Sequence, residues 1–247
     1  MGGDSEAIPG HLQSNISSTD LTSGSSSLQN PNDDGTPSSS TNGSSSNANG
    51  KKAVRSSDNS IPPESRYQLS LGRSNPSDAD DVLSIALPVF TQTFAHTCSE
   101  EDMTLYLNTH FTLEHILAEL NNPNKRFLIA YDTTDTLSSS SKGKCAGFAQ
   151  LTIGSSEPCV EDIPDKVELQ RIYVDSEHHG SGLARLLMNA ALSVAKSEGY
   201  KNIWLGVMQG NTRAEKFYQK FGFERVGQHD FYLGSDKQTD DILVRSL

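Results

Sequence analysis

A glycine-rich turn carries the clearest chemical signal in this chain. It spans residues 178–182 (HHGSG), after an apolar segment at 169–174 and before an amphipathic segment at 183–196. Glycines between a strand and a helix let backbone N–H groups close around an anion, and the positive end of the helix dipole favours phosphate there. The turn therefore predicts a pyrophosphate site, and so a nucleotide-like ligand.

A second pattern follows downstream. Its residues are Asn211, Ala214, Phe217, Tyr218, Gly222 and Phe223, spaced Asn-x-x-Ala-x-x-Phe-Tyr-x-x-x-Gly-Phe. Together the two patterns resemble the GNAT acetyltransferase superfamily, whose turn motif is Gln/Arg-x-x-Gly-x-Gly/Ala. Residues 179–184 match this motif except that His179 replaces Gln or Arg. Taken alone, the first pattern could be an ordinary glycine turn before a helix. The presence of both motifs in the family's order favours a CoA site.

Three further segments, residues 168–174, 203–207 and 231–240, are similar to the bacterial PaiA-type polyamine acetyltransferases. The resemblance covers residues 66–247. It implies an N-acetyltransferase that uses acetyl-CoA as cosubstrate and transfers acetyl directly to a primary amine of a small molecule, with a polyamine as one candidate. Two alternatives stay open: a protein lysine or N-terminal acetyltransferase, and a CoA-binding interaction module without catalysis.

The resemblance also implies which residues bind the donor. The diphosphate would lie on the N–H groups of residues 179–185, and the pantetheine would contact the main chain of residues 172–174. The implied set is Ile172, Tyr173, Val174, His179, Gly180, Ser181, Gly182, Leu183, Ala184, Arg185, Asn211, Ala214 and Tyr218. Asn211 could also cap a helix, which is compatible with binding. Gly182→Glu is expected to place a charged side chain in the diphosphate path.

Three groups are candidates for the chemistry of acetyl transfer. The Val174 N–H is the implied oxyanion donor, and Tyr218 is the implied general acid, with core packing as its alternative. Glu168 matches the position of the glutamate base in histone-type members. It lies six residues before Val174, so strand alternation predicts that both share a face. A surface glutamate or an ion-pair partner is the alternative for Glu168.

Composition separates a tail from a domain. Residues 1–65 are rich in Ser and nearly lack aromatics, and such a segment cannot bury enough apolar surface to offset the entropy of ordering. We expect a disordered tail over residues 1–65 and one mixed α/β domain over residues 66–247. The resemblance implies the GNAT fold, with a mostly antiparallel, splayed sheet of about seven strands flanked by helices.

Periodicity, caps and turn residues predict the elements. Ser77 is expected to cap a helix that Pro88 kinks or breaks, and Ser99 and Thr112 are expected to begin two more. The expected strands are 66–72, 126–131, 144–153, 167–174, 202–207, 223–233 and 241–247, with helices at 183–198 and 211–221.

Charge and composition limit the partners. The net charge of −11 argues against nucleic acid and suits a cationic substrate. The acidic candidates for its pocket are Glu100, Glu101, Asp102, Asp230, Asp236, Asp240 and Asp241. His178, His179 and His229 are not spaced like a metal site, so we expect no metal.

Location and assembly follow from weaker signals. No apolar run approaches the roughly 20 residues of a membrane span, and the N-terminus lacks the pattern of a secretory signal. The three cysteines are widely spaced, which suggests a reducing compartment. We expect no membrane partner and a cytoplasmic location, with the nucleus as a further option. A homodimer is a candidate assembly because GNAT enzymes often form dimers.

Overall fold

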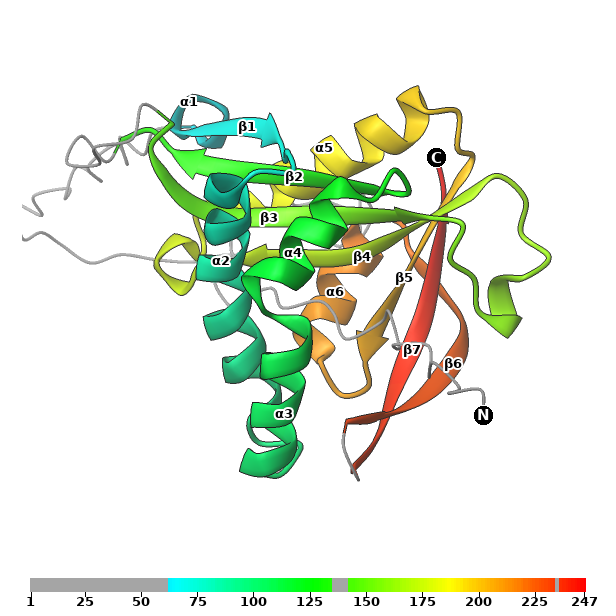
Figure 1. Cartoon of the computed structure of the whole chain (residues 1–247). Helices are drawn as coiled ribbons and strands as arrows, with labels where there is room; N and C mark the ends of the chain where they lie inside the picture. Colours follow the sequence, from blue (N-terminus) through cyan, green and yellow to red (C-terminus); the bar gives the residue numbers. More distant parts are fainter. Residues whose placement is uncertain (1–61, 135–141, 234–235) are drawn as a thin grey trace, which may run out of the picture.

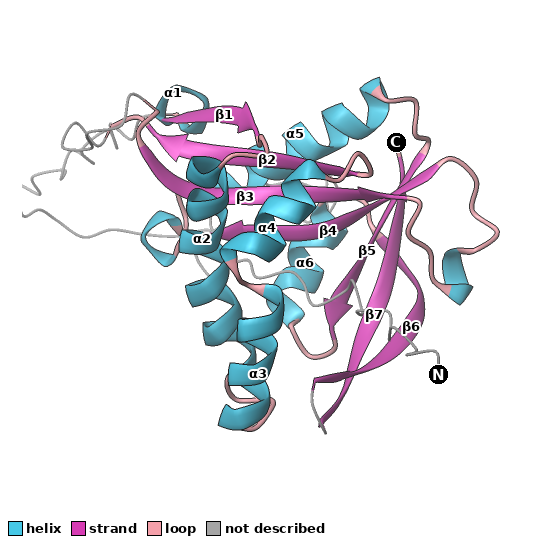
Figure 2. Cartoon of the chain, in the orientation of Figure 1, coloured by secondary structure: helices cyan, strands magenta, loops and turns pink. Residues whose placement is uncertain are grey.

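The structure, a computed structural model, describes residues 62–134, 142–233 and 236–247. Within them, one central sheet carries helices on both faces (Figure 1; Figure 2). Residues 1–61 of the predicted tail lie outside the described residues, as does most of the predicted polar loop at 133–143. A short helix, α1 (Pro63–Arg66), crosses the predicted domain boundary. In the described ranges, no helix is long and apolar enough to cross a membrane.

The sheet has seven strands in the order β1-β2-β3-β4-β5-β7-β6, and only β4 and β5 run parallel. The strands are β1 (Tyr67–Leu71), β2 (Lys125–Asp132), β3 (Lys144–Ile153), β4 (Lys166–Val174), β5 (Asn202–Met208), β6 (Glu224–Leu233) and β7 (Asp236–Ser246). The parallel pair is joined only where residues 166–168 meet residues 202–204. Beyond this point the two strands no longer pair, which leaves a split in the middle of the sheet. The predicted splayed, mostly antiparallel sheet is confirmed.

Helices cover both faces of the sheet (Figure 1). α2 (Pro76–Phe94), α3 (Glu100–His110) and α4 (Leu113–Asn121) pack on one face, and α5 (Leu183–Ser197) and α6 (Thr212–Lys220) pack on the other. Two short 3-10 turns, η1 (Pro158–Val160) and η2 (Ser176–His178), flank β4. Because β4 supplies side chains to the cores on both faces, it is buried along almost its whole length.

Helix starts agree with the sequence in two cases and differ in one. The side chains of Ser99 and Thr112 cap α3 and α4 by accepting the N–H groups of residues 102 and 115, as predicted. Asn75, and not Ser77, caps α2, and its side chain accepts the Asp78 N–H. The reason is Pro76, whose fixed φ and missing N–H suit the first helical position.

Pro88 does not break its helix, so the predicted break is wrong, and the predicted kink stays a prediction. α2 continues past it to Phe94. The residues on either side, Ile85 and Val89, are buried in the core under this face of the sheet. We attribute the continuity to this packing, which outweighs the cost of one lost backbone hydrogen bond.

A β-bulge changes which residues of β4 share a face. The register between β3 and β4 shifts between Gln150 and Leu151, so Gln170 is an extra residue on β4. The β4 residues that join the core under α5 are Val167, Leu169, Ile172 and Val174. The alternation between Glu168 and Val174 is therefore broken, and the prediction that they share a face is wrong.

Candidate active site

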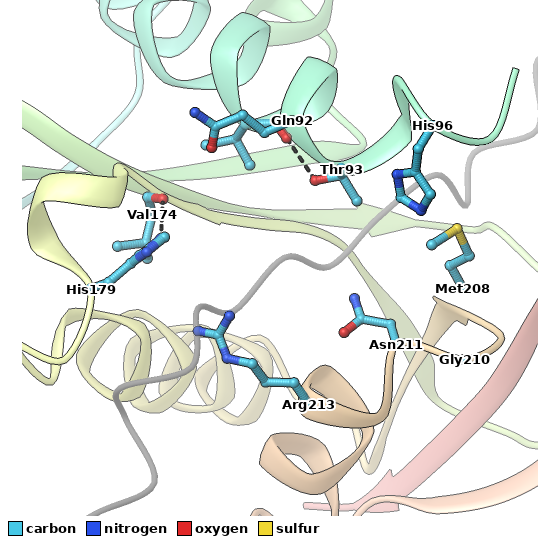
Figure 3. Close-up of a pocket in the computed structure, with 10 residues that line it drawn as sticks. Gln92, Thr93, His96, Val174, His179, Met208, Gly210, Asn211 and Arg213 are labelled. Atoms are coloured by element: carbon cyan, nitrogen blue, oxygen red, sulfur yellow. Dashed lines mark hydrogen bonds between the residues drawn. The ribbon is translucent and has the colours of Figure 1, made fainter. Parts of the chain in front are cut away.

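A cavity of about 380 Å³ lies at the open end of the split (Figure 3). Its lining comes from α2, the end of β4 with the glycine turn, and the end of β5 with the start of α6: Val89, Gln92, Thr93, His96, Val174, His179, Met208, Gly210, Asn211 and Arg213. Both sequence motifs thus contribute to one cavity.

The glycine turn has the geometry of an anion-binding loop. Gly180 and Gly182 have φ angles of 77° and 84°, a left-handed conformation that glycine adopts without strain. Gly182 immediately precedes α5, whose first turn holds no acidic residue. The first N–H groups of a helix have no intrahelical partner and carry a partial positive charge. The loop therefore fits a diphosphate such as that of acetyl-CoA.

The side chains of the loop matter less than its backbone. Leu183 and Ala184 are buried in the core below α5, and Arg185 is exposed. A β-carbon at position 182 would lie only 2.7 Å from Pro63 Cγ. A side chain at position 182 would therefore press on α1, and the effect of Gly182→Glu on the diphosphate path stays a prediction.

The main chain of β4 faces the split at alternate residues. Asp175 N donates to Ala146 O of β3 at 2.9 Å. Because peptide groups alternate along a strand, the N–H and C=O of Val174 point the other way, toward the split. The His179 ring lies on that edge, with Nε2 3.3 Å from Val174 O (Figure 3).

The same alternation corrects the predicted pantetheine contacts. A β-carbon on Gly147 of β3 would lie 2.6 Å from Tyr173 O, so the Tyr173 peptide faces β3. The alternation assigns the main chains of Ile172 and Val174 to the split, and excludes that of Tyr173. The Tyr173 side chain instead packs in the core under α2.

α6 carries the second motif into the site. The Asn211 side chain caps α6 by accepting the Ala214 N–H at 3.1 Å, and the residue also lines the cavity. Ala214 is buried, and so is Tyr218, whose ring meets Phe217 and Phe223 edge-on. Tyr218 therefore packs in the aromatic core, and its acid role stays a prediction.

Glu168 lies at the closed end of the split. It is the last β4 residue that pairs with β5, opposite Trp204, and it is only 1% exposed. The surface-glutamate alternative is therefore wrong. The bulge places it on the opposite face of the sheet from the Val174 side chain, where α2 and α4 pack.

A buried ionic network covers that face. Its members are Glu119, Lys125, Gln150, Gln170 and Arg171. Glu119 accepts from Arg171 Nη1 at 2.6 Å and from Lys125 Nζ. Burial raises the pKa of Glu119, but the charges of Arg171 and Lys125 outweigh it and lower the pKa to about 2. The charge of Glu168 also acts on Lys125, so the network extends toward the closed end of the split.

Among the seven predicted acceptor-pocket carboxylates, only Asp240 is buried, at 1% exposed. It pairs on β7 with Met208, which lines the cavity. Burial raises the pKa of the Tyr173 phenol, which is itself only 1% exposed.

Four of the other acidic candidates have different surroundings. Asp230 pairs with Lys237 on the surface, and Asp241 pairs with Arg225. Glu100 and Glu101 border a separate shallow pocket on α3. In the part of the chain that the structure describes, no three His, Cys, Asp or Glu side chains are grouped to hold a metal.

Sequence reasoning missed Arg213 and the Glu119–Arg171 pair. Arg213 brings a cation to the cavity, and its place between Asn211 and Ala214 of the second motif was a usable signal. Glu119 and Arg171 are 52 residues apart in the chain, so no local pattern connects them.

Comparisons with known proteins agree with this geometry. A model of the acetyltransferase (GNAT) family matches residues 83–223. An uncharacterized N-acetyltransferase of Mycobacterium tuberculosis is 29% identical over 170 residues, which is 69% of this chain and 98% of that protein. A spermine/spermidine N(1)-acetyltransferase of Bacillus subtilis is 33% identical over 91 residues, 36% of this chain and 59% of that protein.

A solved structure shares the fold. PaiA N-acetyltransferase from Thermoplasma acidophilum, in complex with coenzyme A, matches with a TM-score of 0.54 at 22% identity. The match covers 73% of this chain and 99% of that one.

Proposed function

This chain belongs to the acetyltransferase (GNAT) family, whose donor is acetyl-CoA, and we propose that its acceptor is the primary amine of a small molecule. The predicted family, the N-acetyltransferase activity and the cosubstrate are confirmed at this level. Within the proposal, a polyamine is the favoured acceptor, and the similarity to a spermine/spermidine acetyltransferase over 91 residues supports this choice.

One observation carries the proposal. The carboxylate of Asp240 is buried on β7, opposite Met208 of β5, which lines the cavity. A carboxylate binds an ammonium group through charge-assisted hydrogen bonds, which are stronger in a buried site than in water. A second ammonium of a polyamine could bind there while the reacting amine approaches the thioester.

The reaction can be assigned to residues as a proposal. Glu168 accepts a proton from the substrate ammonium, and the neutral amine nitrogen attacks the thioester carbonyl carbon. The Val174 N–H donates to the resulting oxyanion. The carbon–sulfur bond then breaks, and Tyr218 gives its proton to the CoA thiolate. The nitrogen loses its second proton, which returns to the Tyr218 phenolate, and Glu168 releases the first proton to solvent. The products are the amide and free CoA, with no covalent enzyme intermediate.

CoA release by the purified full chain tests the proposal. Spermidine, spermine, small monoamines and a lysine-rich peptide would each be supplied with acetyl-CoA. We expect saturable turnover with the polyamines and little with the peptide. Turnover with the peptide alone would assign the activity to protein acetylation. Acetyl-CoA binding without turnover on any acceptor would favour a CoA-binding module.

The base assignment has its own test. Glu168→Gln should lower turnover and change the pH–rate profile without changing acetyl-CoA affinity. The exposed Glu177 provides a matched control in Glu177→Gln. An unchanged profile in Glu168→Gln would remove Glu168 from the mechanism.

A further inference from the structure

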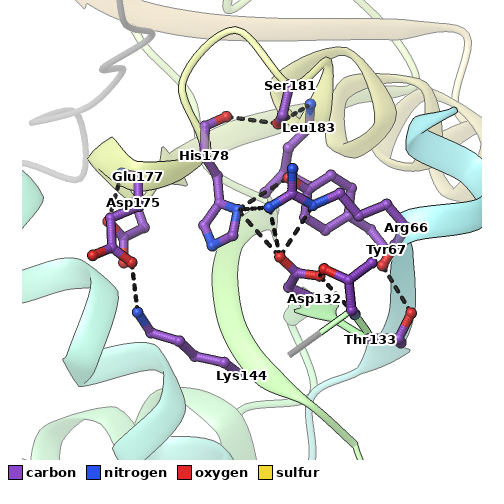
Figure 4. Close-up of polar contacts among 11 residues, drawn as sticks. Arg66, Tyr67, Asp132, Thr133, Lys144, Asp175, Glu177, His178, Ser181 and Leu183 are labelled. Carbon is purple, nitrogen blue, oxygen red and sulfur yellow. Dashed lines mark hydrogen bonds and ion pairs between the residues drawn. The ribbon is translucent and has the colours of Figure 1, made fainter. Parts of the chain in front are cut away.

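A buried polar cluster lies at the start of the glycine turn (Figure 4). At its centre is His178, 5% exposed, whose Nδ1 lies 3.0 Å from Tyr67 Oη and 3.4 Å from Arg66 Nη2. The Asp132 carboxylate accepts from Arg66 at 2.7 Å and lies 3.7 Å from the same Nδ1. The cluster thus joins the last residue of η2 to α1, β1 and β2.

The surroundings of His178 favour its neutral ring, with Nδ1 as a hydrogen-bond acceptor. Burial lowers the pKa of His178, and the charge of Asp132, which raises it, does not offset this. The neighbours of Nδ1 are the Tyr67 hydroxyl and the Arg66 guanidinium, both able to donate. The proton of neutral His178 then resides on Nε2, which is buried and has no hydrogen-bond partner among the described residues. The ring is therefore held through Nδ1.

The other end of the turn meets the same short segment. Pro63 of α1 lies against Gly182, close enough that a β-carbon at position 182 would come within 2.7 Å of Pro63 Cγ. Residues 63–67 therefore contact both ends of the turn, His178 at its start and Gly182 at the first turn of α5. Inside the turn, Ser181 Oγ donates to the His178 carbonyl at 2.6 Å. Because of this hydrogen bond, the position of His178 also determines where the loop amides next to Ser181 lie.

We propose that His178 is a positioning residue for donor binding. Residues 63–67 hold the diphosphate loop in place through their contacts with His178 and Gly182, and we call these contacts the clasp. The inference rests on the proposed use of residues 179–185 as the diphosphate site. Loop amides bind an anion well only when they are already oriented toward it. The clasp supplies that orientation from outside the loop, and it makes the residues that follow the N-terminal tail part of the donor site.

Binding of two donors to the full chain tests this proposal. Acetyl-CoA contains the diphosphate, and acetyl-pantetheine has the same thioester without it. We expect His178→Phe, which keeps an aromatic ring and removes Nδ1, to weaken acetyl-CoA binding about tenfold, the effect of one or two hydrogen bonds. The affinity for acetyl-pantetheine and its kcat should stay within about twofold of wild type. Calorimetry gives the affinities, and CoA or pantetheine release gives the rates.

Two further variants keep the test decisive. Tyr67→Phe removes one hydroxyl from the same cluster and should weaken acetyl-CoA binding in the same direction by less, even if His178→Phe folds poorly. Glu177→Gln is the matched control, since Glu177 is the adjacent residue of η2 and its exposed side chain pairs with the exposed Lys144. It should bind both donors like wild type.

Equal affinity of wild type, His178→Phe and Tyr67→Phe for acetyl-CoA would overturn the positioning role. An equal loss for both donors would also overturn it, because the effect would then be a general one on the fold. A wild-type chain that does not bind acetyl-CoA would overturn the proposed function itself, so the two failures are distinguishable.

Discussion

The two sides of the β4–β5 split are built in different ways. The proposed donor side consists of backbone: strand edges at Ile172 and Val174, and a glycine loop with left-handed φ angles before α5. The proposed acceptor side consists of side chains, among them Glu168, Asp240 and the network around Glu119. A cosubstrate can be held by local backbone geometry, whereas a particular amine needs charges placed by several separate elements.

The largest expected effect tests whether the donor side also supplies chemistry through a side chain. Tyr218→Phe removes one hydroxyl from a buried ring and should lower kcat by about 10²–10⁴, the range of a general acid. Acetyl-CoA affinity should not change. Tyr200→Phe is the control, because Tyr200 packs against the same core. If Tyr218→Phe keeps wild-type kcat, the donor side acts through backbone alone. The contrast between a donor side made of backbone and an acceptor side made of side chains would then be complete.

The second prediction tests whether the acceptor side depends on its buried charges. Glu119→Gln leaves Arg171 buried without its carboxylate, and breaking such a pair should cost about 3–5 kcal/mol of unfolding free energy. Urea unfolding at pH 7 measures the change. Glu198→Gln is the control, since its pair with Arg126 is partly exposed, and it should cost less than about 1 kcal/mol.

The same network gives a pH dependence with a definite sign. The folded pKa of Glu119, about 2, lies below its ordinary value of 4.5. Its ionised form therefore stabilises the fold above pH 4.5, and this stabilisation is lost as the pH falls from 4.5 toward 2. Between these values, wild type should lose more stability than Glu119→Gln. Parallel curves would contradict the assigned ion pair.

The sequence predicted the glycine loop and the helix caps because their signals are local. Gly180, Gly182 and Asn211 act within one or two turns of chain, and the caps at Ser99 and Thr112 are equally local. The face of Glu168 could not be predicted in the same way. β4 is buried on both faces, so its sequence shows no alternation in which an extra residue such as Gln170 would be visible.

Long-range pairing explains the remaining gaps. His178 and Tyr67 are 111 residues apart, and Arg171 and Glu119 are 52 apart, so only the completed sheet brings them together. Asp240 was one of seven acidic candidates, and burial alone distinguishes it from the exposed Asp230. Charge composition indicated a cationic substrate without indicating which carboxylate would meet it.

The third prediction sharpens the comparison on the acceptor side. Asp240→Asn removes a buried charge and should raise KM for spermidine about 10–100-fold, the worth of a hydrogen bond to a charged group. KM for acetyl-CoA should stay the same, and a monoamine should be affected less. Asp230→Asn, at an exposed site paired with Lys237, should leave both KM values unchanged. An equal effect on monoamines and polyamines would exclude Asp240 as the site of a second ammonium.

The smallest expected effect distinguishes two roles of one donor-side residue, the capping of a helix and the binding of acetyl-CoA. Asn211 caps α6 and lines the cavity, so Asn211→Ala should cost about 1 kcal/mol of stability through the lost cap and also weaken acetyl-CoA binding. Asn211→Ser restores an oxygen that can accept the Ala214 N–H but no amide N–H₂ group. Thermal unfolding should therefore recover in Asn211→Ser while acetyl-CoA affinity does not. If thermal stability and acetyl-CoA affinity recover together in Asn211→Ser, Asn211 serves the donor site only by beginning α6 at the correct residue. This wall of the donor site would then also depend on backbone placement and not on a side-chain contact with the donor.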